Sequence, residues 1–392
     1  MPQGDVTRGM IQTVTDETNI IRDVSEVIDF LSPFDTPFLN LVGRDSLHFP
    51  CTQVKHEWLE DELMGRSGTL GAAYVAGSGT LEVSTDEGKF LVPDDIIQVE
   101  EGANRIVFRV TGGAPAIDVL TVTRIGGSTD TAFSSGSYWE KVSHAAQEGG
   151  EARADMTKTE IGNPYNYTQI YKDWAYVSGT MRVIRRYGYV SERAYQEEKL
   201  MRRLGIDLEK DTMYQVRSYS KGPPRRSTAG GLAHYVLFPG ITNSEAEVHD
   251  AAAAAITENM LNDVLQVMWD NGGSPNIIVV NGTNKRYLTS WATPRIRTAQ
   301  EERTAGASIG VYESDFGVLD ILLHRWIRPE HVIIGARQHI GVGPLEGRQF
   351  SSRLLPRTGD YDRYEILGEY TKEVHYPSVE WGWIYRTKTT YS

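Results

Sequence analysis

The stretch "SERAYQEEKLMRRLGIDLEKDTMYQV" covers residues 191–216 and predicts one long amphipathic helix. Its first residue, Ser191, is a favourable helix N-cap, and a glutamate follows it in the first turn. Apolar residues recur along it every three to four positions, as they do on the buried face of a helix. We expect a helix over residues 191–218, about 40 Å long, whose buried stripe consists of Leu200, Met201, Leu204 and Leu208.

An apolar segment broken by prolines, "FLSPFDTPFLNLVG" at residues 30–43, precedes this helix in the chain. Residues 20–31 predict a short amphipathic helix. We expect Pro33 and Pro37 to end that helix and to force extended backbone after it. The segment is too irregular to form a helix face of its own, so its apolar side chains need a partner elsewhere.

The middle of the chain has the pattern of a small β subdomain at about residues 83–142. Three β-branched runs at 95–100, 105–110 and 117–124 predict antiparallel strands. Gly-rich segments at 65–80 and 125–137 predict flexible flanks. Two aromatic residues after the third run, Tyr138 and Trp139, are candidates for contact with another subunit. For Trp139 the favoured role is to close the subdomain's own core.

The rest of the chain alternates between strand and helix patterns. Residues 166–184 and the alternating segment 361–376 predict long strands. Residues 255–345 combine two amphipathic helices with short apolar runs and predict a compact α/β unit.

The composition argues against several classes of protein. The 392 residues carry a net charge of −12, a poor balance for a protein that wraps nucleic acid. The single cysteine, Cys51, leaves no intrachain disulfide framework. No apolar run approaches the ~20 residues of a membrane helix, so we expect no membrane partner. Because the sequence has no metal-ligand spacing, phosphate-binding loop or nucleophile motif, we expect no metal, cofactor or catalytic residue.

Three stretches together resemble one known family. The first is "DVSEVIDFLSPFDTPFLNLVG" at residues 23–43, and the second begins with "EGGEARADMTKTEIGNPYNYTQIYKDWAYVSGT" at residue 148 and continues through the long helix. The third joins "VYESDFGVLDILLHRWI" at 311–327 to "LLPRTGDYDRYEILGEYTKEVHY" at 354–376. Their joint order is similar to that of the major capsid proteins of tailed bacteriophages.

The resemblance implies an α+β fold of the Hong Kong 97 (HK97) type, in which an N-terminal arm, an E-loop, a peripheral domain and an axial domain follow one another. The long helix would be the spine of the peripheral domain, and the β subdomain would be an insertion in the E-loop. On this sequence the resemblance assigns residues 1–52 to the arm, 53–170 to the E-loop region, 171–225 and 345–392 to the peripheral domain, and 226–344 to the axial domain.

The same resemblance implies a structural protein that assembles with itself into hexamers and pentamers, which form the icosahedral shell around phage double-stranded DNA. The arm would pack on neighbouring subunits, and partly on the subunit's own spine helix, through Phe34, Phe38 and Leu39. Further implied partners are a portal protein at one vertex, a scaffold or decoration protein, and DNA without sequence readout. The protein would be assembled in the host cytoplasm and reside in the virion.

Two other functions stay open at this point. One is an encapsulin-type cellular compartment, which neighbouring genes would separate from a phage shell. The other is an α/β enzyme with a β accessory domain, which would not form rings or shells in the electron microscope.

Overall fold

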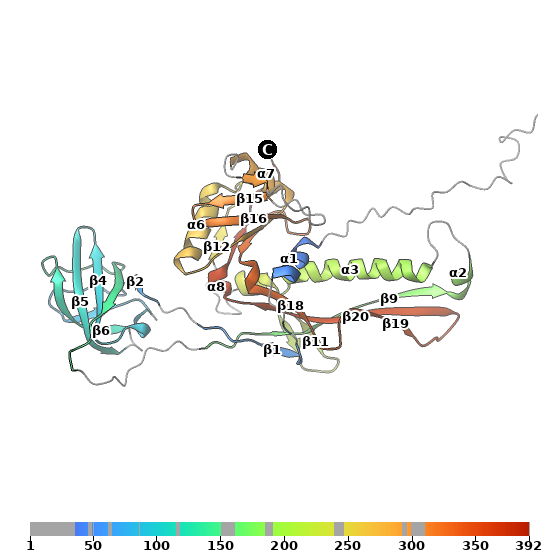
Figure 1. Ribbon diagram of the computed structural model, residues 1–392, viewed down its shortest axis with the longest axis horizontal. Helices are drawn as coiled ribbons and strands as arrows, with labels where there is room; N and C mark the ends of the chain where they lie inside the picture. Colours follow the sequence, from blue (N-terminus) through green and yellow to red (C-terminus); the bar gives the residue numbers. More distant parts are fainter. Residues whose placement is uncertain are drawn as a thin grey trace, which may run out of the picture. The chain divides into compact units, whose positions relative to one another are not determined.

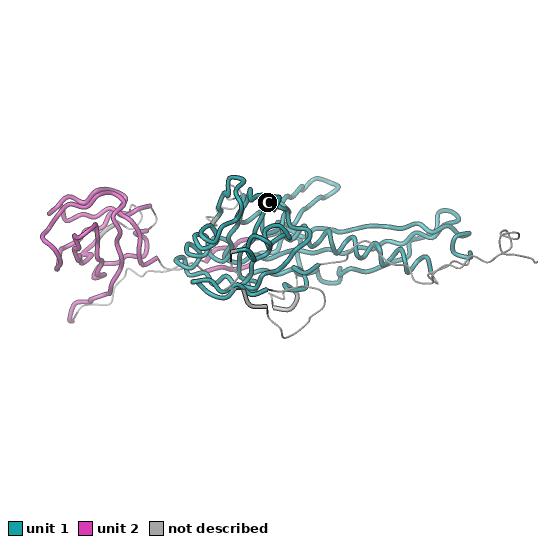
Figure 2. Tube along the Cα trace, turned by 90° about the horizontal axis from the view of Figure 1, so that it is seen from above, with its two compact units in different colours: residues 1–57, 165–392 teal, residues 58–164 magenta. Residues whose placement is uncertain are grey.

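The computed structural model describes residues 36–45, 49, 51–61, 65–85, 87–114, 118–149, 161–184, 191–238, 247–291, 296–298 and 310–391. The chain divides into two compact units (Figure 2): unit 1 comprises residues 1–57 and 165–392, and unit 2 comprises residues 58–164. Each unit has a core of its own.

The predicted long helix is α3, Glu192–Tyr214, and the Ser191 side chain accepts a hydrogen bond from the amide of Ala194 at its start. It is shorter than expected, because Gln215 adopts extended backbone and the short strand β10 begins at Ser218. Within the stripe, Leu200, Leu204 and Leu208 are buried, but Met201 is 38% exposed. The expected place of Met201 in the stripe is therefore wrong: the sheet contacts a narrow face of α3, and Met201 lies one residue, or about 100°, round the helix from Leu200.

The helix α3 covers one face of a four-stranded sheet (Figure 1). Its central strand is β20, Tyr361–Val374, which pairs along one edge with β9, Gln169–Ser178. Along the other edge it pairs with β18, Ile340–Pro344, and β19, Ser351–Leu355. Tyr171 and Ile366 meet the α3 leucines in one apolar cluster, so helix and sheet share a core.

The second sheet of unit 1 has seven strands in the order β12-β21-β17-β13-β16-β15-β14. Their bounds are β12 Glu247–Asp250, β13 Ile277–Val280, β14 Ile296–Thr298, β15 Gly310–Ser314, β16 Gly317–Leu323, β17 Val332–Gly335 and β21 Trp381–Tyr385. The helices α6, Glu258–Asp270, and α7, Gly282–Trp291, pack against it.

The border between the two sheets is not the one that the sequence predicts. The expected axial segment covers residues 226–344. The strand β18 lies within that segment but belongs to the four-stranded sheet. The strand β21 lies after residue 344 but belongs to the seven-stranded sheet. The reason is pairing: β21 lies between β12 and β17 and completes a sheet that strands 247–335 begin. Two short helices flank these junctions: α4, Leu232–Val236, and α8, Pro377–Glu380.

The described part of the arm contains a helix where extended backbone was expected. Pro37 is the first residue of α1, Pro37–Asp45, and does not end a helix. Proline is well suited to this position, because its missing N–H has no partner within the first turn in any case. The expected helix at 20–31 and Phe34 lie outside the described residues.

The ends of the arm and of α3 lead into small elements. The strand β1, Lys55–Glu57, pairs with β8, Tyr165–Tyr167, and β10, Ser218–Ser220, pairs with β11, Arg226–Thr228. The helix α2, Gly179–Val183, follows β9, and the 3-10 turn η3, Arg337–His339, precedes β18.

Unit 2 is a closed six-stranded antiparallel barrel. Its strands follow the order β2-β7-β4-β5-β6-β3. The edge strands then meet each other: Leu70 pairs with Val83, and Gly71 N–H donates to the Glu82 carbonyl at 3.0 Å. This pairing joins the two edge strands and closes the sheet on itself at this point. The bounds are β2 Ser67–Thr69, β3 Thr80–Glu82, β4 Asp95–Glu101, β5 Asn104–Ala114, β6 Val119–Gly127 and β7 Tyr138–His144, with the 3-10 turn η1 at Gly88–Phe90.

The barrel corrects the expected subdomain of three strands at 83–142. The segment 65–80, expected to be a flexible flank, supplies the strand β2, the first residue of β3 and the buried side chains of Leu70 and Tyr74. The segment 125–137 likewise supplies Phe133, which is 1% exposed. The glycine-rich composition wrongly predicted flexible segments, because the glycines form turns between short strands. Leu70, Tyr74 and Phe133 of these segments are buried in the barrel core.

Candidate assembly surfaces

The face of the four-stranded sheet opposite α3 is rich in exposed aromatic side chains. Along β9, Tyr171 and Val177 are buried, whereas Trp174 and Tyr176 are 50% and 54% exposed. Side chains alternate between the two faces of a strand, so these two exposed rings lie on one face together with Ile170, which is 44% exposed. We call this the outer sheet face, made of Ile170, Lys172, Trp174, Tyr176, Arg353, Leu355, Arg363 and Glu365.

Charged groups surround the rings on the outer sheet face. Glu365 is fully buried and forms ion pairs with Lys172 and Arg353. The Arg353 Nε lies 2.6 Å from the Glu365 carboxylate. These two cations lower the pKa of Glu365, the Lys172 ammonium most. Arg363 has no carboxylate partner in the described part of the chain, and its guanidinium lies 6.0 Å from the centre of the Tyr176 ring. A groove of about 200 Å³ runs between these side chains. This face thus has apolar rings and a surplus of positive charge.

A second surface is the two-stranded ribbon of residues 55–61 and 161–167. Its ladder begins with Lys55 opposite Tyr167, and an isolated bridge joins Glu60 to Gly162. Two large apolar side chains stand out on it, Leu59 at 68% and Ile161 at 63% exposed. Alternation places Glu57 and Asp61 on the same face as Leu59. Two strands alone are barely stable in water, so this ribbon needs cover.

The arm is anchored to the spine helix by one buried carboxylate. Glu209 of α3 accepts hydrogen bonds from the backbone N–H groups of Phe38 and Leu39, at 2.9 and 2.8 Å. A negative charge at these N–H groups also matches the positive end of the α1 dipole. Because of this anchor, α1 is held to its own subunit.

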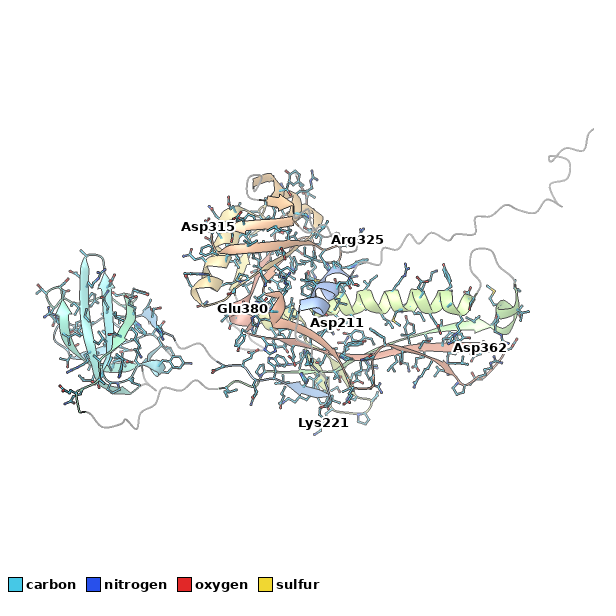
Figure 3. All side chains as sticks on the ribbon, in the orientation of Figure 1. Asp211, Lys221, Asp315, Arg325, Asp362 and Glu380 are labelled. Carbon is cyan, nitrogen blue, oxygen red and sulfur yellow. The ribbon has the colours of Figure 1, made fainter. Side chains whose placement is uncertain are left out.

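A buried cation lies between the spine helix and the sheet. The Lys372 Nζ donates to Asp211 Oδ2 at 2.7 Å and to the Tyr171 hydroxyl at 3.3 Å, and that hydroxyl also donates to Asp211. Burial lowers the pKa of Lys372, and Asp211 opposes that shift. Burial of the Tyr171 hydroxyl raises its pKa well above the usual value, and the negative charge of the nearby Asp211 is the second largest cause of this shift. Figure 3 labels Asp211 on α3. The triad joins α3, β9 and β20.

A histidine cluster ties the foot of the ribbon to β20. His56 and His375 both contact the carboxylate of Glu373, the latter at 3.0 Å. Hydrogen bonding with the Cys51 thiol, and next with Glu373, raises the pKa of His56 to about 9. The His56 ring also stacks on Phe49 with centroids 4.7 Å apart. His56 is therefore positively charged at neutral pH.

The predicted contact residues occupy different environments and are not brought together. Phe38 is fully buried within its own subunit, so its expected role as a contact to neighbouring subunits is wrong; Leu39 packs against the α3 cluster. Trp139 is fully buried in the barrel core, and Tyr138 beside it is 46% exposed. Sequence reasoning missed Ile170, Trp174 and Tyr176, although the alternation of "QIYKDWAYV" at 169–177 contains the signal.

Other kinds of site find little support in the described residues. They include no group of three or more histidine, cysteine, aspartate or glutamate side chains arranged to hold a metal ion. None of the helices described has the length and apolar character needed to cross a membrane.

Comparisons with known proteins agree with this arrangement of sheets, spine helix and arm. The family model described as SU10 major capsid protein matches residues 7–381. The capsid chain of a native GTA particle superposes with a TM-score of 0.52 at 8% identity, covering 96% of this chain and 99% of that one.

Two further solved structures are less similar. A chain of Microbacterium phage Oxtober96 gives a TM-score of 0.49 at 10% identity over 96% of this chain and 99% of its own. The SrpI encapsulin of Synechococcus elongatus gives 0.44 at 10% identity over 59% of this chain and 79% of its own. The search of curated proteins found no match to the sequence.

Proposed function

We propose that this chain, which belongs to the SU10 major capsid protein family and is a structural protein of a phage capsid shell with the HK97-type fold, builds that shell as hexamers and pentamers of itself. The shell is icosahedral and encloses double-stranded DNA. A portal protein at one vertex and a scaffold or decoration protein complete the set of partners.

One observation supports the proposal most directly: a single chain presents two surfaces that complement each other. The ribbon has exposed apolar Leu59 and Ile161 beside the Lys55–Glu57 ion pair, and the outer sheet face has apolar rings between cations. None of the residues that the structure describes covers either surface within its own subunit. In a shell of identical subunits, the ribbon of one copy covers the outer sheet face of the next through Leu59 and Ile161.

The charge of unit 2 supports a place for the barrel on the outside of the shell. Residues 58–164 contain 17 acidic and 8 basic residues, so nine of the twelve net negative charges lie there. Packaged DNA repels such a module, and the outer surface separates the two. The DNA contacts the inner wall without sequence readout, since the chain as a whole is acidic.

The test is the double variant Trp174→Ser/Tyr176→Ser on the outer sheet face. We expect folded, soluble subunits or capsomers that fail to close into shells, as seen by negative-stain microscopy and size-exclusion chromatography. Trp269→Ser, which changes a tryptophan that is 58% exposed on α6, is the matched control. Normal shells from the double variant would show that this face is not an assembly contact. Failure of the unaltered chain to form any ring or shell would overturn the proposed function itself.

A further inference from the structure

The hairpin β10–β11 presents positive charge on a rigid base. Its tip, Lys221 to Arg225, and the adjoining Arg226 are exposed, and Figure 3 shows Lys221 at the lower edge of unit 1. The base is held by ring contacts: Tyr219 stacks on Tyr167 with centroids 4.5 Å apart and planes 15° apart. The Ser227 hydroxyl also donates to the Thr168 carbonyl at 2.5 Å. The hairpin is thus a fixed part of the surface.

Two cations of the hairpin lack a counter-charge. Arg225 pairs with the buried Glu369 at 3.1 Å. Lys221 and Arg226, in contrast, have no carboxylate partner among the residues that the structure describes. A third cation, Arg217, directly precedes β10 in the chain, and its guanidinium lies 3.9 Å from the centre of the Tyr165 ring. On a chain of net charge −12, this is a local surplus that attracts an acidic partner.

The chain itself contains such a partner in unit 2. Its net charge of −9 is concentrated in 107 residues, and the bridge from Leu70 to Val83 joins its two edge strands. We therefore expect a contact with it to use its charged side chains. Three of its carboxylates have no partner in the described part of the chain: Glu82, Glu140 and Glu148.

We infer that the β10–β11 hairpin is an electrostatic docking surface for the acidic barrel of a second copy of this chain. The inference rests on the proposed function, because only a shell brings many copies together. DNA is the less favoured occupant. Two unpaired cations supply few phosphate contacts, and the tyrosines already stack on one another, which leaves little for a nucleic acid to use.

The experiment reverses charge on each side in the full-length chain. Lys221→Glu/Arg226→Glu should lower the yield of closed shells by about tenfold or more, since it opposes like charges across the contact. Adding Glu82→Lys/Glu140→Lys/Glu148→Lys should restore the yield. The matched control is Arg325→Glu, an exposed cation of unit 1 without a carboxylate partner in the described residues; it should leave the yield unchanged.

Salt provides an independent readout. Shells of the unaltered chain should lose thermal stability between low and high salt, because salt screens the attraction between the hairpin and the barrel. Residual shells of the hairpin variant lack that attraction and should therefore lose much less thermal stability. Rescue by the barrel reversal together with this change in salt response supports the inference. Absence of rescue, or normal shells that merely lose packaged DNA, would overturn it. An unaltered chain that forms no shells would instead contradict the proposed function.

Discussion

His324 Nε2 lies 2.6 Å from Glu209 Oε1, and both side chains are fully buried. The other ring nitrogen, Nδ1, accepts hydrogen bonds from the backbone N–H groups of Trp326 and Ile327 at 3.1 Å each. Because Nδ1 accepts, Nε2 carries the proton and donates it to Glu209. One carboxylate thus joins the arm helix, the spine helix and the end of β16.

The first prediction concerns this joint. Glu209→Gln keeps the shape but replaces an acceptor oxygen with a donor that faces N–H groups, so buried donors are left without partners. We expect the free energy of unfolding to fall by about 1–3 kcal/mol for each unsatisfied group, and the arm to become the first site of limited proteolysis. Glu198→Gln on the exposed side of α3, which breaks only a surface pair with Arg202, is the control and should cost less than about 0.5 kcal/mol.

The second prediction concerns the narrow buried face of α3. Leu204→Ala removes a side chain that is 4% exposed and should lower the free energy of unfolding by about 2–5 kcal/mol, measured by chemical denaturation. Met201→Ala, three residues earlier and 38% exposed, should cost less than about 1 kcal/mol. Equal losses for the two variants would contradict the assignment of the buried face.

Local pattern was enough to predict α3, β9, β20 and the apolar helices of the seven-stranded sheet, because each has strong periodicity. Partners distant in sequence could not be predicted in this way. The strand β21 pairs with β12 across more than a hundred residues and with β17 across about fifty. The bridge from Leu70 to Val83 joins the two edge strands of the barrel, and short strands of this kind give no sequence pattern that predicts such a pairing. The anchor at Glu209 lies on α3 among other acidic residues, and only the fold reveals that it is buried.

The third prediction concerns the buried triad. Lys372→Met leaves Asp211 as a buried charge without its cation, so we expect a loss of about 3–5 kcal/mol in the free energy of unfolding. Adding Asp211→Leu removes that charge and should recover much of the loss. If the double variant is less stable than Lys372→Met alone, the penalty does not come from an unpaired carboxylate.

The fourth prediction is the dependence of stability on pH. The pKa of His56 is raised to about 9, so its contribution is complete below its unfolded value of about 6.5 and is lost as pH rises through about 9. Burial lowers the pKa of His234 and of His331 to about 4, so these contributions are present above about pH 6.5 and are lost as pH falls toward 4.

Thermal stability should therefore be greatest near pH 6.5–7 and decline on both sides. His56→Gln should flatten the alkaline side and leave the acid side unchanged, which differential scanning calorimetry can measure. An alkaline decline of the same size in His56→Gln would assign that decline to other groups.

The last prediction concerns the boundaries of the inserted barrel. A linker in place of residues 83–142 removes β4, β5, β6 and most of β7 but leaves β2 and β3, so Leu70, Tyr74 and Leu81 lose the core that buries them. We expect that variant to aggregate, because it exposes both apolar side chains and unpaired strand edges. A Gly-Ser linker between residues 61 and 161 removes the whole barrel and should leave unit 1 folded and soluble, with its α3 and sheet cores intact. Circular dichroism and light scattering distinguish the two variants. If both variants aggregate, the folding of unit 1 depends on the barrel. If both are soluble, the remaining short strands do not expose an aggregation-prone surface.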